Sequence, residues 1–306
     1  MNKILPYLIA IPLVALALLP PNNYWIWAVL LSACLGFYTL FIKVDLFIKI
    51  FSVFAFLNCF FSAAPHISFS NYIWFAGFVY FYILCTKIKN WKPIYNILLT
   101  VFILQLFLVC VQVLNIDALM NFGRKSNIIY GSVGNSMQLK SLLIVIGAFL
   151  IAYRKPRRLK LIIISLVSVV LIYAILCRVI YWFPLVRGPA WQEALRLSFQ
   201  HPFLGWGIGT FKEIFPALGK GVFAQEGIWR NLHNDWLQLF FETGLLGITL
   251  IAGFILSLII KLLRTDNIHC LVGLVMIMAS MCYYFPLNQP HCILIMIMFL
   301  AYMKSQ

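Results

Sequence analysis

Three arginines and one histidine are the residues of this chain best suited to chemistry, and all four lie in one polar stretch. Within residues 178–244 the sequence carries Arg178, Arg187, Arg196 and His233. Guanidinium groups bind phosphate oxygens in pairs and stay charged at any relevant pH, so converging arginines make a natural receptor for a diphosphate. Histidine titrates near neutral pH, so it can accept a proton from a hydroxyl group. The stretch therefore predicts a site for a phosphorylated substrate and a proton transfer.

Further polar residues can support such a site. Lys140 and Arg124, from a preceding polar stretch, add positive charge that can bind the same diphosphate. Asn234 is placed to orient the neighbouring histidine or its helix. Asp235 and Glu193 can instead pair with the arginines, and the sequence leaves these roles open.

The same residues also have structural alternatives. Trp191 and the other loop tryptophans can stack on sugar rings or anchor the loop at a membrane interface. A single arginine beside apolar surface often extends toward lipid headgroups. His233 could likewise fill an ordinary packing position.

A metal or cofactor site is not indicated. The sequence has no H-x-x-x-H, H-E-x-x-H or Asp-x-Asp pattern, and none of its eight cysteines falls in a C-x-x-C spacing. The cysteines are expected to be small packing residues. We therefore expect neither a metal nor a cofactor.

The elements that position these residues are predicted to be membrane helices. Hydrophobic residues make up 63% of the 306 residues and charged residues only 10%, whereas a soluble domain carries about 25% charged residues. We predict an all-α integral membrane protein with about ten transmembrane helices. The predicted spans are residues 4–20, 24–42, 46–64, 72–86, 93–114, 139–153, 161–177, 245–260, 271–285 and 290–303. The last two, joined by Pro-Leu-Asn-Gln-Pro, could instead form a re-entrant pair.

Basic residues predict the orientation of these spans. With the loops numbered alternately, fourteen of the 23 Lys and Arg residues fall on one side, which the positive-inside rule makes cytoplasmic. Both termini are then cytoplasmic, and residues 178–244 face outward, which in a bacterium with two membranes means toward the periplasm from the inner membrane. The net charge of +15 is explained by cytoplasmic loops that face anionic lipid headgroups, so membrane lipid is an expected partner and nucleic acid is not.

The chain is expected to have three parts. Residues 1–177 form an N-terminal transmembrane bundle, and residues 245–306 form the C-terminal transmembrane helices. Between spans seven and eight, residues 178–244 form a helical periplasmic loop domain that carries the candidate active site. No second soluble domain is expected.

A short amphipathic helix is predicted at residues 189–200 of the loop. One of its faces is formed by Trp191, Ala194, Leu195 and Ser198. The glycines of residues 205–209 then make a flexible turn. They do not indicate a dinucleotide-binding loop, since no βαβ unit surrounds them.

A second helix is predicted at residues 231–244, with Asn231 as its N-cap and Gly244 at its end. His233 then lies in the first turn, at the positive end of the helix dipole. That placement favours a neutral imidazole close to anionic phosphates.

A transporter or flippase is the main alternative of another class. Secondary transporters generally keep ionisable residues within the bilayer and break helices at mid-depth. None of the eight acidic residues falls near the middle of a predicted span. The pattern therefore favours an enzyme.

Four pieces of the loop follow one another in a fixed order. They are Arg187-x-x-x-Trp191-Gln-x-Ala194-Leu, His201-Pro-x-x-Gly205-x-Gly207-x-Gly209-x-Phe211, His233-Asn234-Asp235-Trp236-Leu237-Gln238 and Glu242-Thr-Gly244-Leu-Leu-Gly247. Together they resemble the bacterial O-antigen ligase and polymerase superfamily. Residues 134–138, Gly-Asn-Ser-Met-Gln, resemble a weaker form of the family's Gly-Asn motif.

The resemblance implies a metal-independent membrane glycosyltransferase. Such enzymes transfer a glycan from undecaprenyl diphosphate, or another polyprenyl diphosphate, to a hydroxyl group of lipid A core, of a growing polymer or of a protein. Arg187 matches the family's loop arginine and His233 its loop histidine, so both are expected to be catalytic. Arg178 is a looser match to a second arginine, whose usual Ser-Arg context is absent. An O-antigen ligase is the expected type, with a polymerase or a protein O-oligosaccharyltransferase as alternatives.

Overall fold

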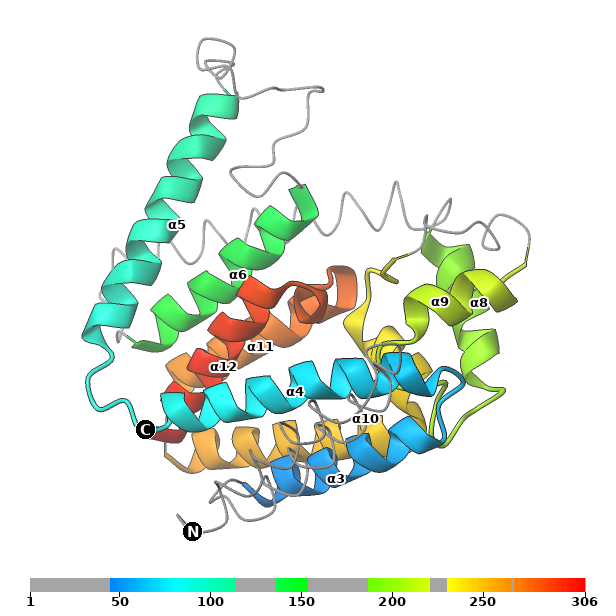
Figure 1. Cartoon of the computed structure of the whole chain (residues 1–306). Coiled ribbons are helices and arrows are strands. Elements are labelled where there is room, and N and C mark those ends of the chain that lie inside the picture. Colours follow the sequence, from blue (N-terminus) through cyan, green and yellow to red (C-terminus); the bar gives the residue numbers. More distant parts are fainter. Residues whose placement is uncertain (1–44, 114–135, 154–186, 221–229, 266, 306) are drawn as a thin grey trace, which may run out of the picture. The chain divides into compact units, whose positions relative to one another are not determined.

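The structure is a computed structural model that describes residues 45–113, 136–153, 187–220, 230–265 and 267–305 (Figure 1). Within these residues the protein is helical and contains no β-strand. The predicted all-α class is therefore confirmed for the described part of the chain. The helices fall into two compact units, and each has its own packing.

Among the described residues, three helices are long and apolar enough to cross a membrane. They are α4 (Pro65–Cys85), α5 (Lys92–Val113) and α10 (Asp235–Arg264). The chain therefore has the helical character of a membrane protein. The predicted spans 4–20, 24–42 and 161–177 lie outside the described residues, so the count of ten stays a prediction.

Four shorter apolar helices overlap other predicted spans. They are α3 (Leu46–Phe60), α6 (Ser136–Tyr153), α11 (Ile268–Tyr283) and α12 (Pro290–Ser305). At 1.5 Å per residue, a helix of about 16 residues is about 24 Å long, which is shorter than a hydrocarbon core of about 30 Å. The re-entrant alternative for the last two therefore stays open.

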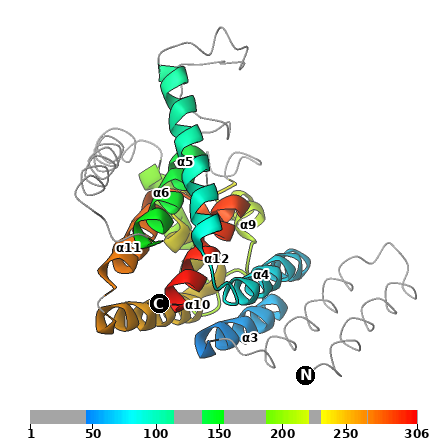
Figure 2. The same cartoon turned by 90° about the vertical axis from the view of Figure 1, so that its left-hand side faces the viewer.

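The first unit contains α3, α4, α8 (Gly188–Ser198), α9 (Phe211–Leu218) and residues 236–258 of α10. Helices α3, α4 and α10 run alongside one another (Figure 1 and Figure 2). Aromatic rings such as Phe56 and Tyr72 pack between α3 and α4. Phe47 of α3 lies against Gly253 of α10. Apolar side-chain packing thus joins the three helices.

Helix α10 is broken at Gly244, where φ is 63° and ψ is −166°. A break leaves backbone N–H and C=O groups without helical partners. The loop turn of residues 202–207 satisfies four of them. Leu245 N–H donates to Pro202 O at 2.8 Å, Leu246 N–H to Phe203 O at 3.2 Å, and the N–H groups of Trp206 and Gly207 donate to Phe241 O and Glu242 O, both at 2.9 Å. The loop is therefore hydrogen-bonded into the broken helix.

The predicted amphipathic helix is confirmed as α8. Its buried residues join α9 and α10 in one apolar cluster, formed by Ala190, Ala194, Leu197, Trp206, Phe211, Phe215, Leu232 and Phe241. The predicted face was wrong at one position, because Leu195 is exposed and Leu197 is buried. Leu197 lies seven residues after Ala190, so helical periodicity places both on the buried face.

The second loop helix begins later than predicted. Helix α10 starts at Asp235, so Asn231 is not its N-cap, and His233 precedes the helix instead of lying in its first turn. Two side-chain hydrogen bonds fix the peptide groups of Leu232 before the helix begins. The predicted end at Gly244 is a break, after which the helix resumes.

The second unit contains α5, α6, α11, α12 and the short 3₁₀ turn η4 (Pro286–Asn288). Helix α6 packs against α5, α11 and α12 (Figure 1). A side chain at Gly273 of α11 would overlap Ala148 O and the ring of Phe299, so glycine permits the close approach. Lys261 Nζ donates to the carbonyls of Met303 and Lys304, which caps the end of α12.

The Gly244 backbone gives a stability prediction. Gly244→Ala should destabilise the protein by about 1–3 kcal/mol through backbone strain, because residues other than glycine rarely adopt the positive φ of this position. The overlap of the added methyl group with the Phe203 carbonyl should increase the loss. The control is Gly77→Ala in α4, where a methyl group meets open space and should stabilise the helix by up to about 1 kcal/mol. Thermal unfolding in detergent, followed by tryptophan fluorescence, measures both. Equal melting temperatures for the two variants would contradict the role assigned to the break.

Candidate functional site

The candidate site residues are divided between the two units. Arg124 and Arg178 lie outside the described residues, so their roles stay predictions. The first unit contains Arg187, Trp191, Glu193 and Arg196, and the second contains Lys140, His233, Asn234 and Asp235. The surroundings of Arg187 and of His233 are therefore set within their separate units.

Arg187 lies directly before α8 and is only 9% exposed. A guanidinium group stays charged, and a buried charge needs compensating polar surroundings. Its burial favours a fixed position in the protein over extension toward lipid headgroups. Arg187 is thus the described arginine whose placement best suits a defined role.

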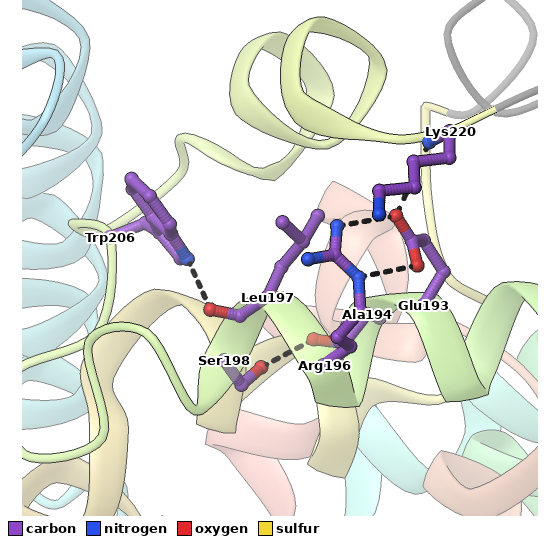
Figure 3. Close-up of polar contacts among 7 residues, drawn as sticks. All are labelled: Glu193, Ala194, Arg196, Leu197, Ser198, Trp206 and Lys220. Atoms are coloured by element: carbon purple, nitrogen blue, oxygen red, sulfur yellow. Dashed lines mark hydrogen bonds and ion pairs between the residues drawn. The ribbon is translucent and has the colours of Figure 1, made fainter.

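Arg196 is paired with Glu193 on α8 (Figure 3). Its Nε donates to one carboxylate oxygen at 2.8 Å and its Nη2 to the other at 2.7 Å. The Lys220 N–H also donates to Glu193, at 3.2 Å. The Arg196 guanidinium holds the pKa of Glu193 below its ordinary value. Glu193 therefore pairs with an arginine, which was one of the roles left open for it. A phosphate would have to compete with this carboxylate for Arg196.

Trp191 takes part in a chain of hydrogen bonds that fixes the residue before His233. Its indole N–H donates to Leu232 O at 2.9 Å, while the Leu232 N–H donates to Gln238 Oε1 at 3.2 Å. Gln238 in turn donates to the buried carboxylate of Glu242 at 3.1 Å, and that carboxylate accepts the Gly209 N–H at 2.8 Å. The peptide groups of Leu232 are therefore held from α8 and from α10.

His233 has a left-handed backbone, with φ at 56°. Within the described ranges it is the one non-glycine residue with positive φ. Such a conformation costs about 1–3 kcal/mol, and residues that keep it gather at functional sites. The His233 ring meets the Phe285 ring edge to face, with centroids 4.7 Å apart. Asn234, which follows, is half-buried.

Asp235 anchors the start of α10 within the second unit. Its side chain is 1% exposed and accepts the Leu287 N–H at 2.8 Å and the Asn288 Nδ2 at 3.2 Å. These bonds join the first residue of α10 to the η4 turn. The structure thus gives Asp235 a positioning role beside His233. Lys140, in the same unit, is half-buried in α6.

Several polar residues that hold the loop were not among the predicted site residues. Gln238 and Glu242 follow Asp235 at helical spacing, and a polar stripe of this kind in an apolar helix was a usable signal. From α3, α4 and their connection, side chains also bind the carbonyls of the glycine turn. These bonds are Asn58 Nδ2 to Leu204 O at 2.6 Å, Ser62 Oγ to Trp206 O at 3.2 Å and Ser68 Oγ to Ile208 O at 3.0 Å.

The glycine turn is tightly packed, in contrast to the flexible turn expected. Gly205, Gly207 and Gly209 all have positive φ. A side chain at Gly207 would overlap Ser62, and one at Gly209 would overlap Asn71. Glycine is therefore required both by the backbone and by the space.

No protein-family model, no curated protein and no solved structure matches this chain. The resemblance of the loop to the O-antigen ligase superfamily therefore rests on the motif residues. Within the ranges that the structure describes, no group of three or more His, Cys, Asp and Glu side chains is arranged to hold a metal ion.

The Asp235 contacts predict a coupling that can be measured. Asp235→Ala should lower the stability of the protein by about 1 kcal/mol or more, because the partly buried Leu287 N–H loses its acceptor. Asn288→Ala should lower the stability by less than Asp235→Ala does, since it removes only one of the two donors to the Asp235 carboxylate. In a double-mutant cycle, unfolding in detergent should give a coupling energy of about 0.5–2 kcal/mol. Strictly additive effects would contradict the Asp235–Asn288 bond.

The Glu193 pair predicts a small, pH-dependent effect. A carboxylate whose pKa is lowered in the folded state contributes stability above its ordinary pKa of 4.5, and loses it as the pH falls through the folded value. The pair is partly exposed, so Glu193→Gln should cost no more than about 1 kcal/mol at pH 7. Thermal unfolding from pH 7 to pH 3 should show this difference vanish at the acid end, and Glu213→Gln, an exposed carboxylate on α9, serves as control. A Glu193 effect that grows toward acid pH would refute the assignment.

Proposed function

We propose that the protein is a membrane glycosyltransferase of the O-antigen ligase type. It would transfer a glycan from undecaprenyl diphosphate to a hydroxyl group of lipid A core, at the periplasmic face of the bacterial inner membrane. The observation that carries the proposal is the strained backbone of His233. Leu232, directly before it, has both its N–H and its C=O group bound by side chains, and Asp235, two residues after it, is buried. The motif order around Arg187 and His233 supports the family, and the apolar helices support a membrane location.

In the proposed reaction, His233 is the general base. The acceptor hydroxyl oxygen forms a bond to the anomeric carbon of the donor glycan, and His233 takes the hydroxyl proton. The bond between that carbon and the diphosphate oxygen breaks, and its electron pair leaves with the polyprenyl diphosphate.

Positive side chains supply the other half of the reaction. The departing diphosphate is weakly basic, so it needs neutralisation of charge more than a proton donor, and a guanidinium group can provide this. Arg187 has this role in the proposal. Four further cations are assigned to diphosphate binding: Arg124, Lys140, Arg178 and Arg196. Neither a metal nor a cofactor takes part in this scheme.

The acceptor distinguishes the proposed ligase from enzymes that use the same donor. A polymerase would extend the glycan on the polyprenyl carrier, and a protein O-oligosaccharyltransferase would glycosylate a protein hydroxyl. The donor half of the site serves all three activities. The ligase is proposed on the motif resemblance.

Transport is a second candidate, because one observation favours it. Helix α10 is apolar and broken, and its first part carries the buried acidic residues Asp235 and Glu242. Broken helices with buried ionisable residues are common in transporters. Gly244 is the tenth residue of this 30-residue helix, however, and the loop turn fills the break.

The proposed function is tested by a transfer assay. Purified protein in proteoliposomes receives an undecaprenyl-diphosphate oligosaccharide and lipopolysaccharide that lacks O-antigen, without divalent metal, and a gel shift reports the product. His233→Ala should lower the rate about 10²- to 10⁴-fold, because the base is lost. Arg187→Ala should abolish detectable transfer. Arg187→Lys should retain part of the activity, since lysine keeps the positive charge but cannot form the bidentate hydrogen bonds of a guanidinium group.

Matched variants make the assay specific. His201→Ala and Arg230→Ala change a histidine and an arginine that lie on the loop outside the proposed machinery, and both should keep near-normal rates. All variants are compared by size-exclusion chromatography, so that a folding defect is recognised. A ladder on the polyprenyl carrier would replace the ligase with a polymerase. Full activity of His233→Ala would refute the proposed base, and movement of the donor across the bilayer without transfer would favour the transporter.

A further inference from the structure

Two aromatic side chains of the loop are exposed just after α8. Phe199 is 64% exposed and Phe203 is 66% exposed, although both belong to the predicted outer loop rather than to a predicted span. Between them lie Pro202 and the exposed His201, and Phe203 itself belongs to the turn that meets α10. Two exposed phenylalanines so close together form an unusual surface for a polar loop, and their position relative to α10 indicates what covers them.

Hydrogen bonds fix these phenylalanines beside the start of the apolar part of α10. The Leu245 N–H donates to Pro202 O at 2.8 Å and the Leu246 N–H donates to Phe203 O at 3.2 Å. The Phe199 ring also meets the Phe240 ring edge to face, with centroids 5.9 Å apart. The loop cannot carry Phe203 away from α10 without leaving backbone donors of the helix unpaired.

The neighbouring surface of α10 is apolar and exposed as well. Leu245 and Leu246 are both exposed where the helix resumes, and Leu256 and Ile260 are exposed further along it. This helix is one of the three with the length and composition of a membrane span. A membrane-spanning helix exposes such residues to lipid chains, so the phenylalanines continue a surface that already has a lipid environment.

We infer that Phe199, Phe203, Leu245 and Leu246 form a lipid-facing patch, with the chains of the bilayer as its occupant. The patch anchors α8 and the following turn at the level where α10 enters the bilayer. Phenylalanine and leucine side chains form the apolar face of segments that lie along a membrane surface, which fits the two exposed rings and the neighbouring leucines. The inference concerns the membrane alone and does not depend on the proposed transfer reaction.

Photo-crosslinking in liposomes tests the patch. The photoreactive amino acid benzoylphenylalanine replaces Phe199 or Phe203, and the protein is reconstituted into phosphatidylethanolamine and phosphatidylglycerol. After irradiation, mass spectrometry should detect phospholipid adducts at both positions. Leu256, an exposed residue within the α10 span, is the positive control, and Lys212, an exposed residue of α9, is the negative control.

The outcomes separate lipid from other occupants. Adducts at residues 199, 203 and 256, with few at 212, support the patch. Adducts at 199 or 203 to a second copy of the chain, or to another segment of the same chain, overturn it and identify a protein contact. An absence of lipid adducts at 199 and 203 when Leu256 is labelled also overturns it, as does labelling at Lys212 equal to that at Phe203.

Discussion

The arrangement of the first unit depends on the backbone groups that the break in α10 leaves without helical partners. Inside an apolar environment, an unpaired N–H or C=O group is too costly to persist, so each must be bound by another part of the protein. The turn of residues 202–207 supplies four partners across the break, two carbonyl groups and two N–H groups. Because these bonds are made by backbone, they require the turn to approach α10 closely, and the glycines of the turn and Gly244 make that approach possible.

Polar side chains of α3, of α4 and of the segment between them also bind backbone groups of the loop turn. Asn58, Ser62 and Ser68 would be unfavourable next to lipid, yet each donates to a carbonyl of the loop turn. Glu242 and Gln238 continue the pattern on α10, where a carboxylate binds the Gly209 N–H and an amide reaches the Leu232 N–H. The polar residues that a hydropathy profile treats as interruptions are therefore the ones that hold the loop. Leu232, the residue before the candidate base His233, is held by one of these hydrogen bonds.

The features that follow from local sequence were the predictable ones. The helical class, α8 and the presence of a turn at the glycines follow from periodicity and residue type within a few neighbouring positions. The tight packing of that turn does not, because it depends on Ser62 and Asn71, which are distant in the sequence. The start of α10 does not, because Trp191 lies 41 residues from the Leu232 carbonyl that it binds. The partners of Asp235 are more distant still, in the turn before α12. Local capping preferences favoured Asn231, and contacts made only in the folded chain outweighed them. The buried stripe of Gln238 and Glu242 was visible in the spacing, whereas its partner Gly209 was not.

The close approach of α6 and α11 has a consequence for biogenesis. A ribosome completes α6 before it reaches α11, so the surface of Gly147 and Ala148 is made without the helix that later covers it. Until α11 is made, the place that Gly273 takes against Ala148 is open to other groups, and they are displaced when α11 packs. Since small residues gain little from contact with lipid but permit tight helix packing, the exchange favours the paired helices. The packing of α6 against α11 therefore forms only after α11 has been synthesised.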